Sequence, residues 1–137
     1  MYTMQLNIAP GKTISEVQQD FNGQYPFLKL EFYKMSDADN SFIIKKHLLH
    51  SAQLKEAGLK KNGTLEIKDK MTVEELEKAF LQQFGLLAQV SRKSGIVWLE
   101  TTMTDKWSLA KQNDHGREIT LNVKNPPADE IGEDIKF

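Results

Sequence analysis

Two stretches of the chain resemble each other closely enough to decide how it is organised. Residues 6–17 read LNIAPGKTISEV and residues 65–76 read LEIKDKMTVEEL, and the two align without a gap at an offset of 59 positions (65 minus 6). The match continues through Phe21 over Phe80 and Tyr25 over Phe84. The sequence therefore predicts an internal repeat of roughly 60 residues, and such a repeat constrains the whole fold.

Each copy of the repeated stretch contains the start of a helix. Thr13 with Glu16, and Thr72 with Glu75, fit the capping box, in which the threonine hydroxyl and the glutamate carboxylate each accept a backbone hydrogen bond. These signals predict helices over residues 13–22 and 72–84.

Both predicted helices carry one apolar stripe. Steps of three and four residues place on it Ile14, Val17 and Phe21 in the first helix and Val73, Leu76, Phe80 and Phe84 in the second. A stripe of this kind packs against a core, so Phe21 and Phe80 are predicted core residues. Gly23 and Gly85 stand where a left-handed helix cap would favour glycine.

Alternation of apolar and polar residues predicts a strand after each helix, at 28–34 and 86–91. A polar loop at 36–40 precedes a further strand at 42–47, and a tight turn at 93–95 leads into a hairpin strand at 96–101. The remaining predicted elements are short helices at 51–57 and 105–112 and strands at 64–68 and 118–123. His115 and Gly116 are predicted to form the turn before the last strand.

This order predicts an α+β fold made of two β-α-β-β-(short α) units with a closing strand, each with its main helix packed on a sheet. Such a unit is compatible with a ubiquitin-like β-grasp or a ferredoxin-like arrangement. The first repeat spans 1–63 and the second 64–124. We expect them to pack as one body, since about 60 residues is near the lower limit for independent stability. Strand 64–68 closes the first unit, opens the second, or does both.

Residues 125–137 differ from the rest of the chain. Pro126 and Pro127 block helix and sheet continuation, and the segment that follows is acidic. We expect a flexible tail. The alternative is that Ile131, Ile135 and Phe137 dock on a groove or on a partner.

The composition excludes several classes of protein. With 39% hydrophobic and 27% charged residues and a net charge of −1, the chain is typical of a soluble globular protein. It has no cysteine, which excludes disulfides, thiolate nucleophiles and cysteine-ligated metals. Its apolar runs are too short to span a bilayer, and residues 1–4 lack the basic flank of a secretory signal. We expect a cytoplasmic protein that does not enter a membrane.

The motifs of common enzymes are missing from the sequence. It contains no Gly-x-Ser-x-Gly elbow, no Walker phosphate loop and no dinucleotide-binding glycine pattern. His47 and His50 lie three positions apart with no carboxylate cluster beside them in sequence, so we expect no metal site. The sequence predicts no cofactor and a chain that is not an enzyme. An enzyme with an unrecognised site is the least favoured alternative.

One face of the predicted sheet is a candidate interaction surface. Alternation leaves opposite the helices the residues Lys29, Glu31, Tyr33, Gln89, Ser91, Lys93 and Trp98. A purely solvated face does not need Ile96 and Trp98, so an interface is expected at Tyr33, Lys93, Ile96 and Trp98, with a protein partner or in a homodimer. The alternative for Trp98 is burial between the two repeats.

The favoured function is therefore a non-enzymatic protein-interaction or assembly module. The second hypothesis is a weak nucleic-acid-binding protein, with Tyr33 and Trp98 stacking bases beside lysines. Residues 1–63, 64–123 and 124–137 carry formal charges of +2, −1 and −2 (eight basic and six acidic, eight and nine, two and four). This distribution lacks the basic bias of a nucleic-acid binder and disfavours that hypothesis.

Several motifs together resemble an uncharacterised family of hypothetical proteins of Bacteroidetes type. They are YPFLKLEF at 25–32, TVEEL at 72–76, FGL at 84–86, RKSG at 92–95, WLETT at 98–102 and TDKWSLAKQN at 104–113. The resemblance covers most of residues 4–122 and implies a small cytoplasmic protein without an assigned function. It supplies no catalytic or binding residues.

Overall fold

The computed structural model describes residues 3–37 and 43–122, and it has an α+β fold, as predicted. The elements in order are β1 (Thr3–Ile8), α1 (Ile14–Gln24), β2 (Leu28–Asp37), β3 (Ile43–His47), the single turn η1 (Leu54–Ala57), β4 (Gly63–Lys68), α2 (Val73–Ala79), its π-helical continuation η2 (Phe80–Phe84), β5 (Leu87–Ser94), β6 (Val97–Glu100), the short turn η3 (Thr102–Thr104) and α3 (Leu109–Leu121). The predicted tail at 125–137 lies outside the described residues.

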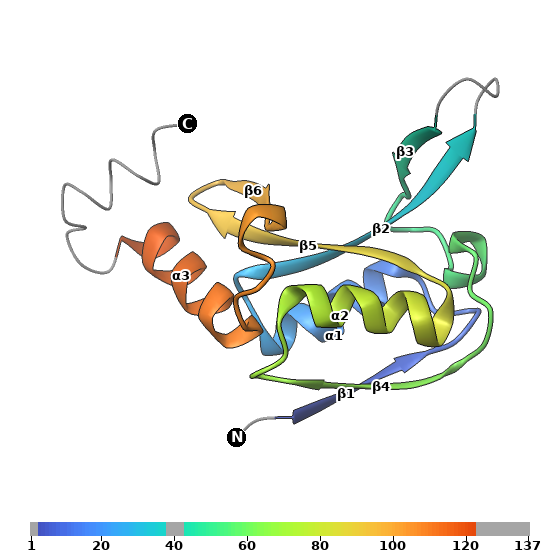
Figure 1. Cartoon of the computed structure of the whole chain (residues 1–137), viewed down its shortest axis with the longest axis horizontal. Coiled ribbons are helices and arrows are strands. Elements are labelled where there is room, and N and C mark those ends of the chain that lie inside the picture. Colours follow the sequence, from blue (N-terminus) through green and yellow to red (C-terminus); the bar gives the residue numbers. More distant parts are fainter. Residues whose placement is uncertain (1–2, 38–42, 123–137) are drawn as a thin grey trace.

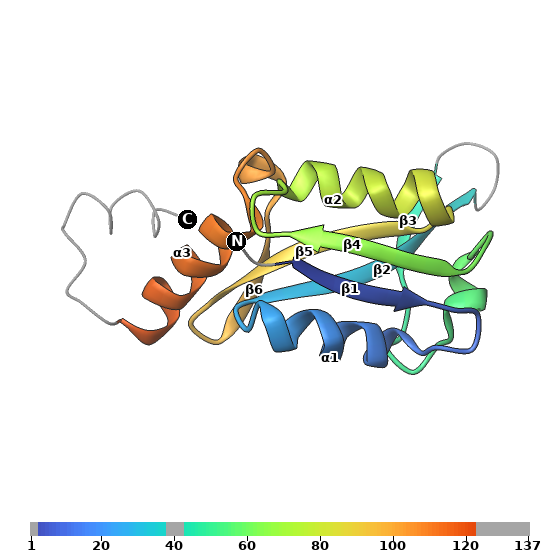
Figure 2. The same cartoon turned by 90° about the horizontal axis from the view of Figure 1, so that it is seen from below.

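Two antiparallel sheets enclose the core. β1 pairs with β4, with Leu6 opposite Leu65, and the larger sheet has the order β3-β2-β5-β6, with Leu30 opposite Val90. The β1–β4 ribbon and the β2–β5 strands form two layers (Figure 1), and α1 and α2 run along opposite sides of them (Figure 2). The predicted strand 64–68 pairs with β1 of the first half and leads into α2 of the second, so it connects the two halves.

Both capping boxes are present. In each, the glutamate N–H donates to the threonine Oγ1 at 3.1 Å and the threonine N–H donates to the glutamate Oε1 at 2.9 Å. The stripes that follow are buried as predicted, and Phe21 and Phe80 are fully buried. The Phe80 ring meets Phe32 of β2 edge-on, with 5.4 Å between ring centroids. Helix caps and apolar spacing thus fix how α1 and α2 face the core.

Matching hydrogen bonds fasten the start of each main helix. Ile14 N donates to Ala52 O at 2.8 Å, and Val73 N donates to Trp107 O at 3.2 Å. In return, a later segment of each half binds the loop before the helix: Leu54 N donates to Lys12 O and Leu109 N to Met71 O, both at 2.8 Å. These pairs fit the predicted repeat, which stays a prediction.

The predicted closing strand at 118–123 and the turn at His115 and Gly116 are wrong. α3 continues through both as far as Leu121. Gly116 lies within the helix because α3 approaches β5 closely. A Cβ at this position would stand 2.9 Å from Arg92 Cγ, 3.0 Å from Phe27 Cβ and 3.2 Å from Lys93 O. The glycine therefore serves packing rather than a turn.

The predicted glycine cap of the first helix is also wrong, whereas that of the second is confirmed. Gly85 adopts a left-handed φ of 73° at the end of η2. Gly23 lies inside α1, which ends at Gln24, and the residue that caps it, Tyr25, has a φ of −123°. Within residues 3–37 and 43–122, no helix is long and apolar enough to cross a membrane.

Truncating the central aromatic side chain tests the assignment of the core. We expect Phe80→Ala to lower the free energy of unfolding by about 3–5 kcal/mol, because a fully buried ring leaves a cavity. Leu81→Ala is the matched control, since Leu81 is exposed on the same helical segment. Urea denaturation measures both. A loss below about 1 kcal/mol for Phe80→Ala would show that the stripe is misassigned.

Two glycine substitutions test the close approach of α3. Alanine stabilises a helix by about 1 kcal/mol more than glycine does. A Cβ added at Gly23 has nothing within 4 Å, so Gly23→Ala should stabilise the protein by ~0.5–1 kcal/mol. Gly116→Ala should instead destabilise it by ~1–3 kcal/mol, because the added methyl group meets Phe27 Cβ and a backbone carbonyl. Equal effects in urea denaturation would contradict this packing.

Candidate functional site

The strand register places the predicted surface residues on one face of the larger sheet. On β2 and β5, Lys29 stands opposite Ser91, Glu31 opposite Gln89, and Tyr33 opposite Leu87. On β5 and β6, Lys93 stands opposite Trp98. Residues that stand opposite each other lie on the same face of a sheet, and so does every second residue along a strand. These residues therefore share one face, which is turned away from the core and which we call the outer face.

Tyr33 and Trp98 lie at opposite ends of the outer face. Tyr33 is level with Leu87, whereas Trp98 is level with Lys93, six residues further along β5 (87 to 93). At about 3.4 Å per residue, the offset along the strand is roughly 20 Å. The two aromatic side chains therefore do not form one continuous binding element.

The Trp98 side chain starts from β6 and lies across the neighbouring strand β5, instead of projecting straight out from the sheet. Its ring centroid is 5.0 Å from Lys29 Nζ on β2 and 5.9 Å from Lys93 Nζ. Since β5 separates β6 from β2, the contact with Lys29 crosses β5, and Ser91, which stands opposite Lys29 on β5, is only 3% exposed. Trp98 thus covers the sheet and connects the two halves of the chain, and its ring is already occupied by two ammonium groups.

The Tyr33 end is covered in a similar way. Lys45 Nζ lies 4.5 Å from the Tyr33 ring centroid, 3.3 Å from Gln89 Oε1 and 3.5 Å from Glu100 Oε2. Gln89 is 7% exposed as a result. The register of Gln89 and Ser91 agrees with the sequence, but the expectation of a wet face does not, because long side chains from neighbouring strands lie over both.

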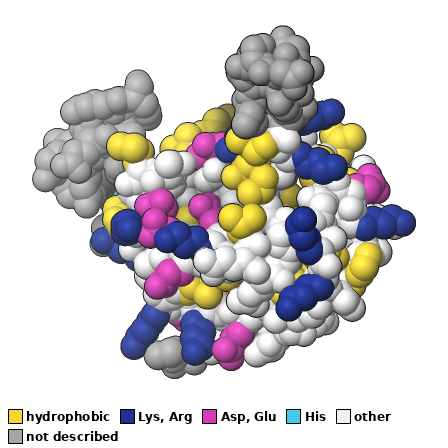
Figure 3. All heavy atoms as spheres, turned by 45° about the vertical axis from the view of Figure 1, so that its right-hand side comes forward, with side chains coloured by type: hydrophobic (Ala, Val, Ile, Leu, Met, Phe, Trp, Pro, Cys, Tyr) yellow, Lys and Arg dark blue, Asp and Glu magenta, His cyan; other side chains and the backbone are white. Residues whose placement is uncertain are grey.

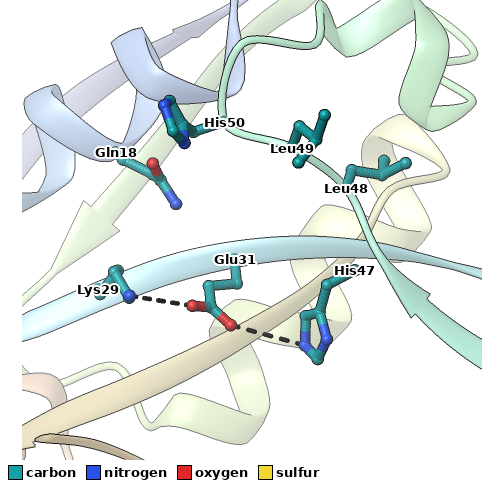
Figure 4. A pocket seen from close by; sticks show the side chains of 7 residues that line it. All are labelled: Gln18, Lys29, Glu31, His47, Leu48, Leu49 and His50. Carbon is teal, nitrogen blue, oxygen red and sulfur yellow. Dashed lines mark ion pairs between the residues drawn. The ribbon is translucent and has the colours of Figure 1, made fainter.

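A depression of about 390 Å³ borders this face beside α1 (Figure 4). It is lined by Gln18, Lys29, Glu31, His47, Leu48, Leu49 and His50. Glu31 lies between Lys29, whose Nζ is 3.0 Å from the carboxylate, and His47, whose Nε2 is 3.5 Å from it. Sequence reasoning missed the Glu31–His47 contact, because it depends on the β2–β3 register.

The histidines of the depression do not assemble a metal centre. His50 stands apart from the Glu31–His47 pair, nearer Gln18 (Figure 4). Within the described part of the chain, no group of three His, Cys, Asp or Glu residues is placed to hold a metal ion. The Glu31 carboxylate already has two partners, so the arrangement is a surface ion-pair network.

Side chains of the two main helices cap the edges of the sheet. Gln18 of α1 donates to Leu30 O at 2.7 Å, and Glu77 of α2 accepts from Val90 N at 2.9 Å. Burial raises the pKa of Glu77 above its ordinary value, although the hydrogen bond from Val90 acts in the opposite direction. Glu77 therefore has a structural role, since its hydrogen bond joins α2 to β5.

Exposed apolar side chains concentrate at the β5–β6 hairpin. Ile96 at its turn is 95% exposed, and Val97 and Leu99 on β6 are 49% and 41% exposed. We call these three residues the hairpin patch. Met103 in η3 follows directly and is 95% exposed. β6 is the last strand of its sheet, so the patch lies on a sheet edge.

Charge on the surface is mixed. Basic and acidic side chains are interspersed over the side of the molecule shown in Figure 3, with no continuous field of one sign there.

Comparison of the chain with family models, with curated proteins and with solved structures found no match.

Replacing Glu77 by glutamine tests its perturbed titration. The pKa of Glu77 is higher in the folded protein than in the unfolded chain. Its carboxyl group therefore contributes stability at a pH below the unfolded pKa, and this contribution is lost as the pH rises through the folded pKa. Glu77→Gln removes that titration and keeps an acceptor for Val90 N. We expect the stability of the variant relative to the wild type to increase between pH 4 and pH 7, measured by urea denaturation. A constant or falling difference would contradict the assignment.

Proposed function

We propose that the protein is a non-enzymatic protein-interaction module whose contact surface is the β5–β6 hairpin. The observation that carries the proposal is the hairpin patch, in which Ile96, Val97 and Leu99 are all exposed within four residues of one another at a sheet edge. Large apolar side chains gathered at one place on a surface are typical of interaction sites.

The hairpin supports this role better than the aromatic outer face does. The Trp98 ring is covered by Lys29 and Lys93, and the Tyr33 ring is covered by Lys45. A partner that binds there would first have to displace these lysines. No such displacement is needed at Ile96, because its side chain is almost fully in solvent.

The nucleic-acid hypothesis has less support. The lysines beside the aromatic rings also form ion pairs, Lys29 with Glu31 and Lys45 with Glu100. A phosphate backbone would compete with these carboxylates for the same ammonium groups. The offset between Tyr33 and Trp98 further separates the two possible stacking platforms.

A triple variant tests the proposal. Ile96→Ser, Val97→Thr and Leu99→Thr together remove the exposed apolar surface while keeping residues that suit a strand. The control is Met35→Ser with Leu81→Ser, which removes exposed apolar side chains elsewhere. Both proteins are used as bait in extracts of the native cells, with bound proteins quantified by mass spectrometry after circular dichroism has confirmed folding. A differently tagged copy of the chain is included among the possible partners.

We expect the hairpin variant to lose its specific partners at least about tenfold, equivalent to roughly 1.4 kcal/mol of binding, and the control to keep them. If the hairpin variant retains the same partners as the wild type and the control, the β5–β6 hairpin is not the contact surface and the proposal fails.

A further inference from the structure

The two edge strands of the larger sheet differ in their protection. β3 at one edge carries Lys45, Lys46 and His47, and lysine on an edge strand discourages pairing with another chain. β6 at the other edge reads Val97-Trp98-Leu99-Glu100, with two apolar side chains beside the tryptophan and no lysine. β6 therefore lacks the lysines that protect the other edge of this sheet.

The backbone of β6 has donors and acceptors directed outward. Lys93 N donates to Phe27 O at 2.9 Å, which is on the side of β5 away from β6. Lys93 and Trp98 are consequently a non-hydrogen-bonded pair of the β5–β6 ladder. In an antiparallel ladder, hydrogen-bonded and non-hydrogen-bonded residue pairs alternate. The backbone N–H and C=O groups of Trp98 therefore point away from β5, and so do those of Glu100, two residues further along the strand. Within the described residues, β5 is the strand neighbour of β6 and no other strand pairs with it.

We propose that β6 pairs antiparallel with β6 of a second copy of the chain, about a two-fold axis at Trp98. The inference rests on the proposed role of the hairpin and names its partner. In this register the two Trp98 residues exchange both backbone hydrogen bonds, Val97 stands opposite Leu99, and Ile96 stands opposite Glu100. The two sheets then join as one sheet of eight strands, four from each copy.

A second copy fits this edge because the edge is complementary to itself. A two-fold contact brings the same surface together twice, so each donor needs its own acceptor at the symmetric position. Trp98 supplies one of each, and the Val97–Leu99 pairs place apolar groups against apolar groups on one face. The net charge of −1 leaves little repulsion between copies.

The short strand also limits the strength of the contact. β6 has four residues, so the pairing buries a small area, and small interfaces are weak and reversible. We expect a dimer with a dissociation constant of roughly 10 µM to 1 mM.

Proline at the outward-facing position tests the pairing. Glu100→Pro removes an N–H group that points away from β5, so the β5–β6 ladder keeps its hydrogen bonds, as proline on edge strands permits. Glu100→Ala is the matched control: both variants lose the Glu100–Lys45 ion pair, but alanine keeps the N–H group. Sedimentation velocity of the full chain is measured between about 10 µM and 1 mM, the range in which small interfaces associate. We expect the wild type and Glu100→Ala to self-associate alike and Glu100→Pro to do so at least about tenfold more weakly.

A second pair of variants guards against misfolding. If circular dichroism shows that Glu100→Pro is unfolded, Val97→Lys, which places a lysine on the edge, replaces it, with Val97→Thr as control. A wild type that is monomeric throughout the range overturns the inference, and so does self-association that is equal in the edge variant and its control. Monomeric wild type together with hairpin-dependent capture of other proteins overturns the second-copy inference alone. Capture that is independent of the hairpin overturns the proposed function itself.

Discussion

The pairing of strands between the two halves of the chain is the constraint on which the rest of the structure depends. β1 pairs with β4 and β2 pairs with β5, so each of the four central strands finds its main partner in the other half. Side chains reinforce this connection: the Tyr25 hydroxyl donates to Asp69 Oδ1 at 2.8 Å, and Phe27 N donates to Asn113 Oδ1 at 2.9 Å. Neither half can therefore complete its sheets by itself, and the core exists only where the halves meet.

The same constraint determines which surfaces are left for partners. Because β2 and β5 occupy the centre of the larger sheet, β3 and β6 become its edges. Gln18 and Glu77 cap the nearby exposed backbone of the central strands, and lysines protect β3. β6 has neither form of protection, and the hairpin patch lies on it. The location of the proposed contact thus follows from the topology of the core.

Local signals in the sequence were sufficient for much of this fold. Thr13 and Thr72 start their helices as predicted, and the stripes ending at Phe21 and Phe84 are buried, because caps and helical spacing act within a few residues. Features that depend on distant contacts were missed. Gly116 was predicted to form a turn, since the close approach of Phe27 is invisible in the local sequence. The contact of Trp98 on β6 with Lys29 on β2 was missed too, because alternation along one strand does not reveal a side chain that reaches across its neighbour.

Native-state hydrogen exchange followed by NMR tests the interdependence of the halves most directly. Glu31 and Gln89 face each other across the β2–β5 junction, and Leu6 and Leu65 face each other across β1 and β4. If cross-half pairing holds the fold together, their slowest amides exchange only through global unfolding, with the same free energy of opening in both halves. Slow amides of one half that open at a clearly lower free energy than those of the other would show that one half stands alone, and would contradict this account.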